Sequence, residues 1–405
     1  STGLLVNGGT LELKNPGSTV IKAKDNGIHL IGDATDSANL YIQNSGEAAN
    51  TVTVESEDKG IYLQSYNGAA RLEIKGLVDI KARDAIVVDA GALSIGGGKI
   101  TSGRDGRAAL YVNALSTVQI NAKADGDGNI VPMHADRDVE IHGDVQVKGG
   151  RAAAYIGLVT PNSIFKGLYT TNLYTWPTNG WEMTSGNGYL VLKNGGTWEH
   201  LKYSTVMQDK NGTAEVGDSR VSRLNSDGGI IRQKDTRKIW IDEFRGNVKL
   251  IYEHENTGTE AADYAAGDVV IQEATPNSSV TMVTGPNNIT VANEGQVRRV
   301  LNALANKLYY NGAISGRKNL TGTAMIAEGL TTPFVSMKSA EITFKQADGQ
   351  GSVDVPALSE LDTEKQIAEL GAASAAQRDF WKTKGVADEN GNYTFSQDAV
   401  LRTDV

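Results

Sequence analysis

The sequence predicts an all-β protein with short helical insertions, built as a parallel β-helix (β-solenoid). Three observations favour this fold. Glycine is frequent, at 46 of 405 residues, whereas proline, at 8 residues, is rare. Short stretches alternate apolar and polar residues, so that each places only two or three side chains on one face of a strand. Similar stretches recur along the chain, and units this short bury a core only when they stack.

Residues 1–150 are predicted to form the first coils of this β-helix. The segments VIKAKDNGIHL and DIKARDAIVVD share one pattern, in which an apolar pair, a charged residue and an aspartate precede a second apolar stretch. Coils of ~20 residues or more with three short strands are typical of a parallel β-helix. A β-sandwich, the main alternative, would use longer strands and hairpin turns. The recurring aspartates are Asp25, Asp58, Asp84, Asp105 and Asp125.

Alternating strands continue beyond residue 150, now with many aromatic residues. We expect residues 151–292 to continue the β-helix with aromatic-rich loops. Residues 311–357 are predicted to form further β coils. Residues 358–405 are predicted to hold a C-terminal helical segment, from capping boxes near 363 and 374, and a terminal strand.

Residues 293–310 break the β pattern and predict an amphipathic helix. Asn293 is the expected N-cap, with Gln296 as its capping-box partner. One apolar face follows from the helical spacing of Val297, Val300, Leu301, Leu304 and Leu308. The helix either packs on the side or end of the β stack or protrudes to bind a partner.

Charge and cysteine content exclude several functions. The formal net charge is −9, which argues against nucleic acid as a partner because phosphate binding needs a basic stripe. Cysteine is absent, so disulfides, thiolate catalysis and cysteine-ligated metals are excluded. The five histidines lack metal-ligand spacing, and we expect neither a metal nor a cofactor.

Several stretches together resemble the passenger domains of bacterial autotransporters, the pertactin-like, type V secreted β-helix proteins. They are the repeats such as IKAKDNGIHL, the segment NGWEMTSGNGYLVLKNGGTWEHL, the strand–Phe–Gly–strand order of residues 239–251, and AADYAAGDVVIQEA with the helical segment that follows. The resemblance covers most of residues 10–350. It implies a right-handed β-helix, a bacterial cell-surface location (outer membrane-anchored or secreted), and a translocating β-barrel in the full-length parent. The absence of cysteine agrees, because disulfides impede threading of an unfolded chain.

No intact catalytic set accompanies this resemblance. In Gly217-Asp218-Ser219-Arg220, the residue after the serine is not the glycine of a trypsin-like protease, and the only later histidine, His254, lacks the aspartate of an esterase pattern. Ser219 is therefore expected in a surface turn. The recurring aspartates are expected to accept backbone N–H bonds in turns rather than to converge as hydrolytic carboxylates. Asp125 to Asn129 resembles a calcium loop, but Ile130 replaces the required glycine, which favours an ordinary turn.

The strongest candidate binding segment combines aromatic side chains with polar loop residues. Its members are Tyr169, Tyr174, Trp176 and Trp181. Tyr and Trp offer rigid stacking area with a polar edge, which suits protein or sugar ligands. The alternative is that these rings cap the open end of the stack or cover an apolar edge.

These observations predict a non-enzymatic extracellular adhesin, which would attach through loops on a rigid β-helix. Its expected partners are a host-cell surface protein or glycan, or neighbouring bacterial cells, and not nucleic acid. Two alternatives stay open. One is a β-helix polysaccharide hydrolase or lyase with aligned carboxylates. The other is a purely structural stalk that holds a distal domain away from the cell.

Overall fold

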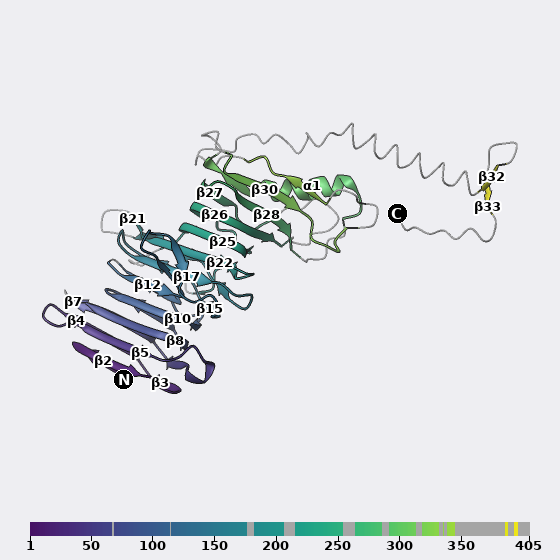
Figure 1. Cartoon of the computed structure of the whole chain (residues 1–405). Helices are drawn as coiled ribbons and strands as arrows, with labels where there is room; N and C mark the ends of the chain where they lie inside the picture. The colour runs from purple at the N-terminus through teal and green to yellow at the C-terminus, as the bar shows by residue number, and fades with distance from the viewer. Residues whose placement is uncertain are drawn as a thin grey trace.

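The structure, a computed structural model, describes residues 1–344 apart from several short segments, and two strands beyond them. Outside the description lie residues 67–68, 114, 176–181, 206–214, 254–263, 286–290, 313–317, 332–334, 336–337, 345–384, 388–392 and 396–405. The described chain is all-β with one α-helix, which confirms the predicted class. Its strands stack one above another from the N-terminus towards α1 (Figure 1).

One side of the stack is a seven-stranded parallel sheet, here called the first column. Equivalent residues of successive repeats lie in register, as in Ile28, Ile61 and Ile86. Pairing between strands that are far apart in sequence therefore builds the stack. The strands, in order, are β1 (Thr2–Asn7), β4 (Asn26–Asp33), β7 (Lys59–Tyr66), β9 (Asp84–Val88), β11 (Leu110–Val112), β16 (Val145–Val147) and β19 (Tyr169–Thr170).

The remaining stacked strands are joined by backbone hydrogen bonds, mostly between parallel strands, into one closed sheet. This sheet contains two further columns. The second column contains β2 (Gly9–Lys14), β5 (Ala38–Gln43), β12 (Thr117–Ile120), β17 (Ala153–Leu158) and β22 (Asn187–Lys193). The third contains β3 (Thr19–Ala23), β6 (Val52–Ser56), β15 (Val139–His142), β18 (Ile164–Lys166) and β23 (Thr197–His200). The columns are linked because β8 (Ala70–Ala82) and β10 (Ala92–Ser102) belong to both, pairing through their first halves in the second column and through their second halves in the third.

Two long strands continue this closed sheet towards the C-terminal end. β25 (Ser219–Gln233) and β26 (Ile239–Tyr252) pair with each other along their whole length. β27 (Val269–Ala274), β28 (Ser278–Thr284), β29 (Leu308–Tyr310) and β30 (Leu320–Met325) follow in parallel, and β31 (Ser339–Glu341) pairs antiparallel with β30. β32 (Gly385–Ala387) and β33 (Tyr393–Phe395) form a separate antiparallel pair.

Along the stacked strands, apolar side chains at every second position point into one shared interior. In the second column a single register row passes through Ile42, Ile74, Ile95, Ile120, Ile156, Leu190, Leu224 and Phe244. Each of these side chains is at most 1% exposed, and all belong to one cluster that extends from Val6 to Ile342. Burying an aliphatic side chain contributes about 1.5–3 kcal/mol, so the row adds substantially to the cohesion between the stacked strands.

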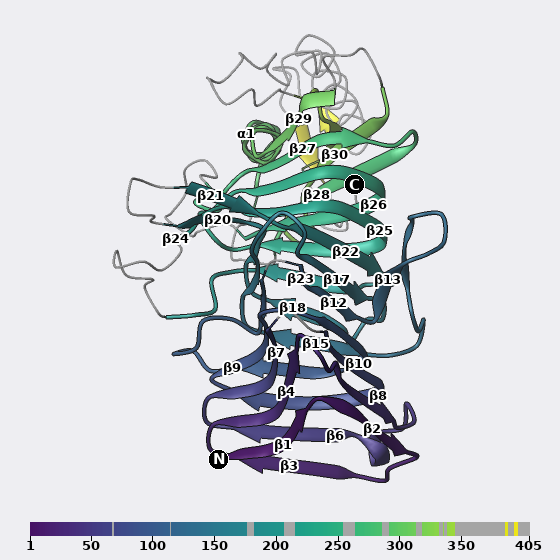
Figure 2. The same ribbon diagram turned by 90° about the vertical axis from the view of Figure 1, so that its left-hand side faces the viewer.

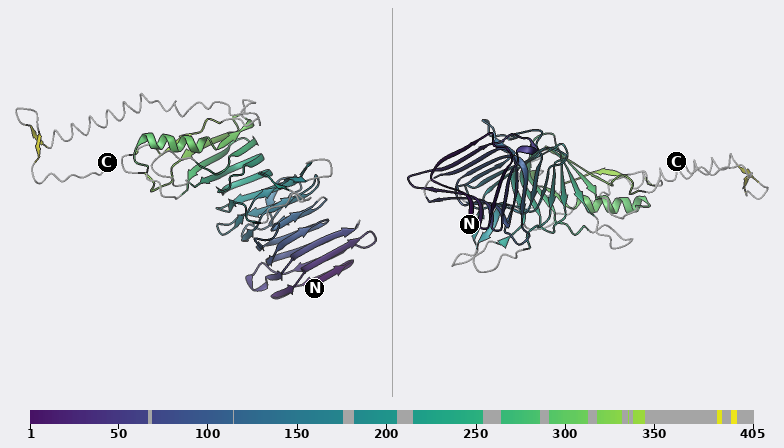
Figure 3. Two further views of the ribbon diagram at one scale, coloured as in Figure 1. Left: turned by 180° about the vertical axis from the view of Figure 1, so that it is seen from behind. Right: turned by 90° about the horizontal axis from the view of Figure 1, so that it is seen from below.

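The one α-helix among the described residues confirms the capping prediction and corrects its length. α1 (Glu294–Ala305) has Asn293 as N-cap, whose side chain accepts the Gln296 N–H, while Gln296 accepts the N–H of Ala292. The prediction over 293–310 was too long, because Leu308 belongs to β29 rather than to the helix. The buried residues of α1 are Val297, Val300, Leu301 and Leu304, so its apolar face packs inward at the end of the stack far from the N-terminus (Figure 3). The helices predicted within 358–405 lie outside the described residues.

Besides the β32–β33 pair, two antiparallel elements lie outside the columns, on opposite sides of the stack (Figure 2). One is the sheet of β20 (Asn172–Thr175), β21 (Glu182–Ser185) and β24 (Glu215–Val216). The other is the hairpin of β13 (Ala122–Ala124) and β14 (Ile130–Pro132), which covers a small second cluster that includes the stacked rings of Tyr155 and Tyr189. Arg223 holds this hairpin, because its Nη1 donates to the Gly128 carbonyl at 3.1 Å.

Replacing Arg223 with methionine should loosen the hairpin. The change removes the bond to Gly128 and the ion pair with Glu243 at 3.0 Å, and we expect it to cost about 1 kcal/mol. Amide hydrogen exchange within residues 122–132 should accelerate. Arg220→Met is the matched control, since Arg220 pairs with Asp242 at 2.7 Å instead. Equal acceleration in both variants would contradict the assigned role.

Candidate functional site

The aromatic segment predicted as a binding surface is only partly covered by the description. Tyr169 is fully buried in β19, and its hydroxyl donates to the Ala154 carbonyl at 2.8 Å. It stacks edge-on against Phe165 and Trp198, so it belongs to the core and offers no surface to a ligand. Tyr174 lies in β20, where its backbone pairs with Met183. Trp176 and Trp181 lie outside the described residues, and their role as ligand contacts stays a prediction.

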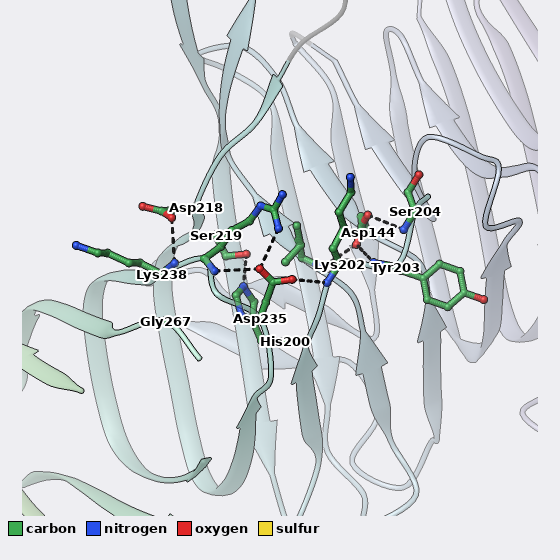
Figure 4. Close-up of polar contacts among 12 residues, drawn as sticks. Asp144, His200, Lys202, Tyr203, Ser204, Asp218, Ser219, Asp235, Lys238 and Gly267 are labelled. Carbon is green, nitrogen blue, oxygen red and sulfur yellow. Dashed lines mark hydrogen bonds and ion pairs between the residues drawn. The ribbon is translucent and has the colours of Figure 1, made fainter. Parts of the chain in front are cut away.

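A buried polar cluster lies where β23 meets β25, and it includes the serine that the sequence placed in a surface turn. That expectation was wrong, because Ser219 begins β25 and is 0% exposed. Its Oγ lies 2.7 Å from Nε2 of His200, which is also 0% exposed (Figure 4). The histidine that contacts Ser219 is therefore His200, at the end of β23.

The hydrogen bonds of Gln233 assign the protons in this cluster. Its Nε2 donates to the carbonyls of Arg237 and Gly267 at 3.0 and 3.1 Å, so its Oε1 faces His200 Nδ1 at 2.5 Å. Nδ1 must then carry the proton and donate, which leaves Nε2 to accept from the Ser219 hydroxyl. The Ser219 oxygen in turn accepts the Tyr169 N–H at 3.1 Å. Every polar atom in this chain of bonds has a partner.

Ser219, His200 and Gln233 follow the order of a nucleophile, a base and an orienting group. A substrate, however, has no access to them. A working nucleophile must meet a substrate carbonyl, and a wholly buried Ser219 whose oxygen already accepts a backbone N–H cannot. Burial also lowers the pKa of His200 to about 4, although the Gln233 hydrogen bond opposes the shift. The role of this cluster is therefore to pair buried polar groups with one another inside the core.

His200 should make the fold sensitive to acid. Its pKa in the folded state, about 4, lies below the ordinary value of 6.5, so the unfolded chain binds a proton first as pH falls. Stability is complete above pH 6.5 and decreases on acidification, by about 2 kcal/mol between pH 7 and pH 5. Urea unfolding at both pH values should show this loss in the native chain and a smaller loss in His200→Gln. An equal loss in both would refute the assignment.

Two buried carboxylates beside this cluster fix the segment that follows β23. Asp235 accepts the Lys202 N–H at 3.0 Å, and Asp144 accepts the N–H groups of Tyr203 and Ser204 at 2.9 and 3.1 Å (Figure 4). Burial raises the pKa of Asp144, against these backbone bonds. Burial also acts to raise the pKa of Asp235, but hydrogen bonds from Arg237 and Lys202 outweigh it. The pKa of Asp235 is therefore lowered from its usual value. Both carboxylates are occupied by backbone donors.

Four of the recurring aspartates, Asp25, Asp58, Asp105 and Asp125, lie between strands, as expected, whereas Asp84 begins β9. Asp58 is ion-paired with Lys59 at 2.7 Å and with Arg83 at 2.5 Å. Asp84 accepts the N–H of Arg107 at 2.5 Å. Asp25 pairs with the amino group of Ser1, and Asp105 lies in the turn between β10 and β11. Cations or a backbone donor therefore already occupy the carboxylates of Asp25, Asp58 and Asp84.

The calcium-like loop is a hydrogen-bonded turn. Asp125 Oδ1 accepts the N–H groups of Asp127 and Asn129 at 2.9 and 2.8 Å, bonds that lower the pKa of Asp125. In the part of the chain that the structure describes, no group of three or more His, Asp or Glu side chains is placed to hold a metal ion.

Comparisons of this chain with protein-family models, with curated proteins and with solved structures each find no match. The likeness to autotransporter passengers therefore stays a prediction. Among the described residues, no helix combines the length and the apolar character needed to cross a bilayer.

Proposed function

We propose that the stacked columns form a right-handed parallel β-helix. Three parallel columns around one apolar interior support this, because each turn of such a helix contributes a strand to each column. β25 supports it further: its start lies beside β19 of the first column, its middle pairs with β22 and its end pairs with β23. Right-handed connections are the general preference between parallel strands.

We further propose that this β-helix is a non-enzymatic extracellular adhesin, the passenger part of an autotransporter at the bacterial surface. The supporting observation is the continuous buried row from Ile42 to Phe244, which makes a stiff scaffold whose outward side chains and loops are left to meet a partner. The serine–histidine pair supports a non-enzymatic role because it is buried. Partners would be host-cell surface proteins or glycans, or neighbouring bacterial cells.

An attachment assay with the full chain tests this function. Fluorescent beads coated with the 405-residue protein should attach to epithelial cells or to bacteria, and an excess of soluble protein should block attachment. Beads that attach to neither would favour the structural stalk. Release of shortened products from a polysaccharide panel would favour the hydrolase or lyase.

A further inference from the structure

A depression of about 380 Å³ lies on the outward face of the second column, near the N-terminal end. Three successive coils contribute to it, through β2, β5 and β8. It is lined by the buried Ile42 and by six residues with outward side chains: Thr10, Glu12, Tyr41, Gln43, Glu73 and Lys75. All six alternate with apolar residues of the same strands, which are buried in β5 and β8 and partly buried in β2, so the alternation that fills the core also turns these groups outward.

Tyr41 occupies the middle of this depression, in register with Glu12 on one side and Glu73 on the other. Two pairs of outward-facing rings elsewhere in the stack cover each other: Tyr155 and Tyr189 stack at 4.6 Å, and His29 stacks on Tyr62 at 4.7 Å. Tyr41 has carboxylate neighbours in register instead, and the Arg71 guanidinium lies over its ring, 5.8 Å from the ring centroid. The Tyr41 side chain is partly exposed, so the ring area that Arg71 does not cover is left for a ligand.

The polar groups around Tyr41 combine acceptors and donors. Glu12 and Glu73 are acceptors, Lys75 is a donor, and Thr10 and Gln43 are both. Glu12 accepts a hydrogen bond from Gln43 and lies 3.5 Å from Lys14, while Glu73 lies 3.7 Å from Arg71. Two coil spacings of about 4.8 Å separate Glu12 from Glu73, so the site is about 10 Å long and suits an extended ligand rather than an ion.

We propose that this depression binds a neutral oligosaccharide, with one sugar ring stacked on Tyr41. A sugar ring has an apolar C–H face for the aromatic ring and hydroxyl groups that both donate and accept, which matches the surrounding set. An anionic ligand would meet two carboxylates, and an apolar one would remove water from them without offering a hydrogen bond in return. The inference rests on the proposed function, because it names the class of ligand that one face of the scaffold takes.

The site binds sugar without cleaving it. A glycosidase needs one carboxylic acid kept protonated by an apolar environment beside a second, ionised one. Here each carboxylate has a cation beside it, Lys14 for Glu12 and Arg71 for Glu73. Both groups are therefore placed as hydrogen-bond acceptors for sugar hydroxyls.

Ligand-observed NMR titration of the full chain with maltotetraose, cellotetraose and N-acetylchitotriose tests the proposal. At least one probe should bind. Tyr41→Ala should weaken its binding at least tenfold, and Glu73→Gln about threefold or more, with unchanged circular dichroism spectra. Tyr66→Ala is the matched control, since Tyr66 is an exposed tyrosine of the first column and should leave binding unchanged.

Three results would overturn the inference: no binding of any probe, binding by Tyr41→Ala equal to the native chain, or shortened probes after incubation. The bead assay separates this inference from the proposed function. Attachment by native and Tyr41→Ala beads alike, with no probe bound, would reject the sugar site and leave the adhesin function standing. Probe binding by a chain whose beads attach to no cell would support the sugar site and reject the adhesin function.

Discussion

Replacing Trp198 with alanine is expected to destabilise the middle of the stack by about 3–5 kcal/mol. Trp198 is 0% exposed, its ring stacks on Phe165 at 5.8 Å, and its Nε1 donates to the Gly167 carbonyl at 2.9 Å. Alanine would leave a cavity and an unpaired buried carbonyl in the same place. Urea unfolding followed by circular dichroism measures the loss.

Trp240→Ala is the control for the loss of a tryptophan as such. Trp240 is half-buried on the outward face of β26, where its Nε1 donates to Asp218 at 3.2 Å. Because its removal opens no interior cavity, we expect a loss of about 1 kcal/mol. Equal losses in the two variants would mean that the interior around Trp198 is not packed as described.

Substituting alanine for Gly246 should be nearly as damaging, at about 3 kcal/mol or more. Gly246 has a φ of +88°, and a Cβ at this position would lie 2.0 Å from the Ser226 carbonyl oxygen of the adjacent strand. A left-handed backbone costs a residue other than glycine about 1–2 kcal/mol, and the contact would in addition force β26 away from β25. Thermal unfolding of the purified variant measures the combined effect.

Gly228→Ala separates the two contributions. Gly228 also has a positive φ, +71°, but its nearest neighbour would lie 3.9 Å from the new Cβ. The control should therefore lose only the backbone cost, about 1 kcal/mol. If Gly246→Ala were no worse than Gly228→Ala, the close approach of β25 and β26 would be wrong.

The fold class could be predicted because its physical cause is local. Strand alternation is visible in single segments, and rows such as Ile42, Ile74 and Ile95 follow once equivalent segments are stacked. The end of α1 could not be predicted this way. Leu308 fits the helical spacing as well as it fits a strand, and only its pairing with Val269 assigns it to β29.

The polar cluster was harder to predict because its members come from different coils. His200 shares strand parity with the buried Trp198, and Ser219 shares it with Val221, so alternation alone could have placed both inside. Their contact depends on β25 beginning beside β19, which no local pattern reveals. The depression around Tyr41 was missed for the same reason, because three separate repeats build it.

Distances between spin labels along the third column test the central claim most directly, and the absence of cysteine leaves every introduced thiol unique. From Val20, the register row reaches Glu140 after four coil steps and Lys249 after eight. Each step is about 4.8 Å. Labels in the double variant Val20→Cys/Glu140→Cys should therefore lie about 19 Å apart, and labels in Val20→Cys/Lys249→Cys about 38 Å apart. A distance that doubles with the number of coils is the predicted result. Two similar distances would contradict a single continuous stack.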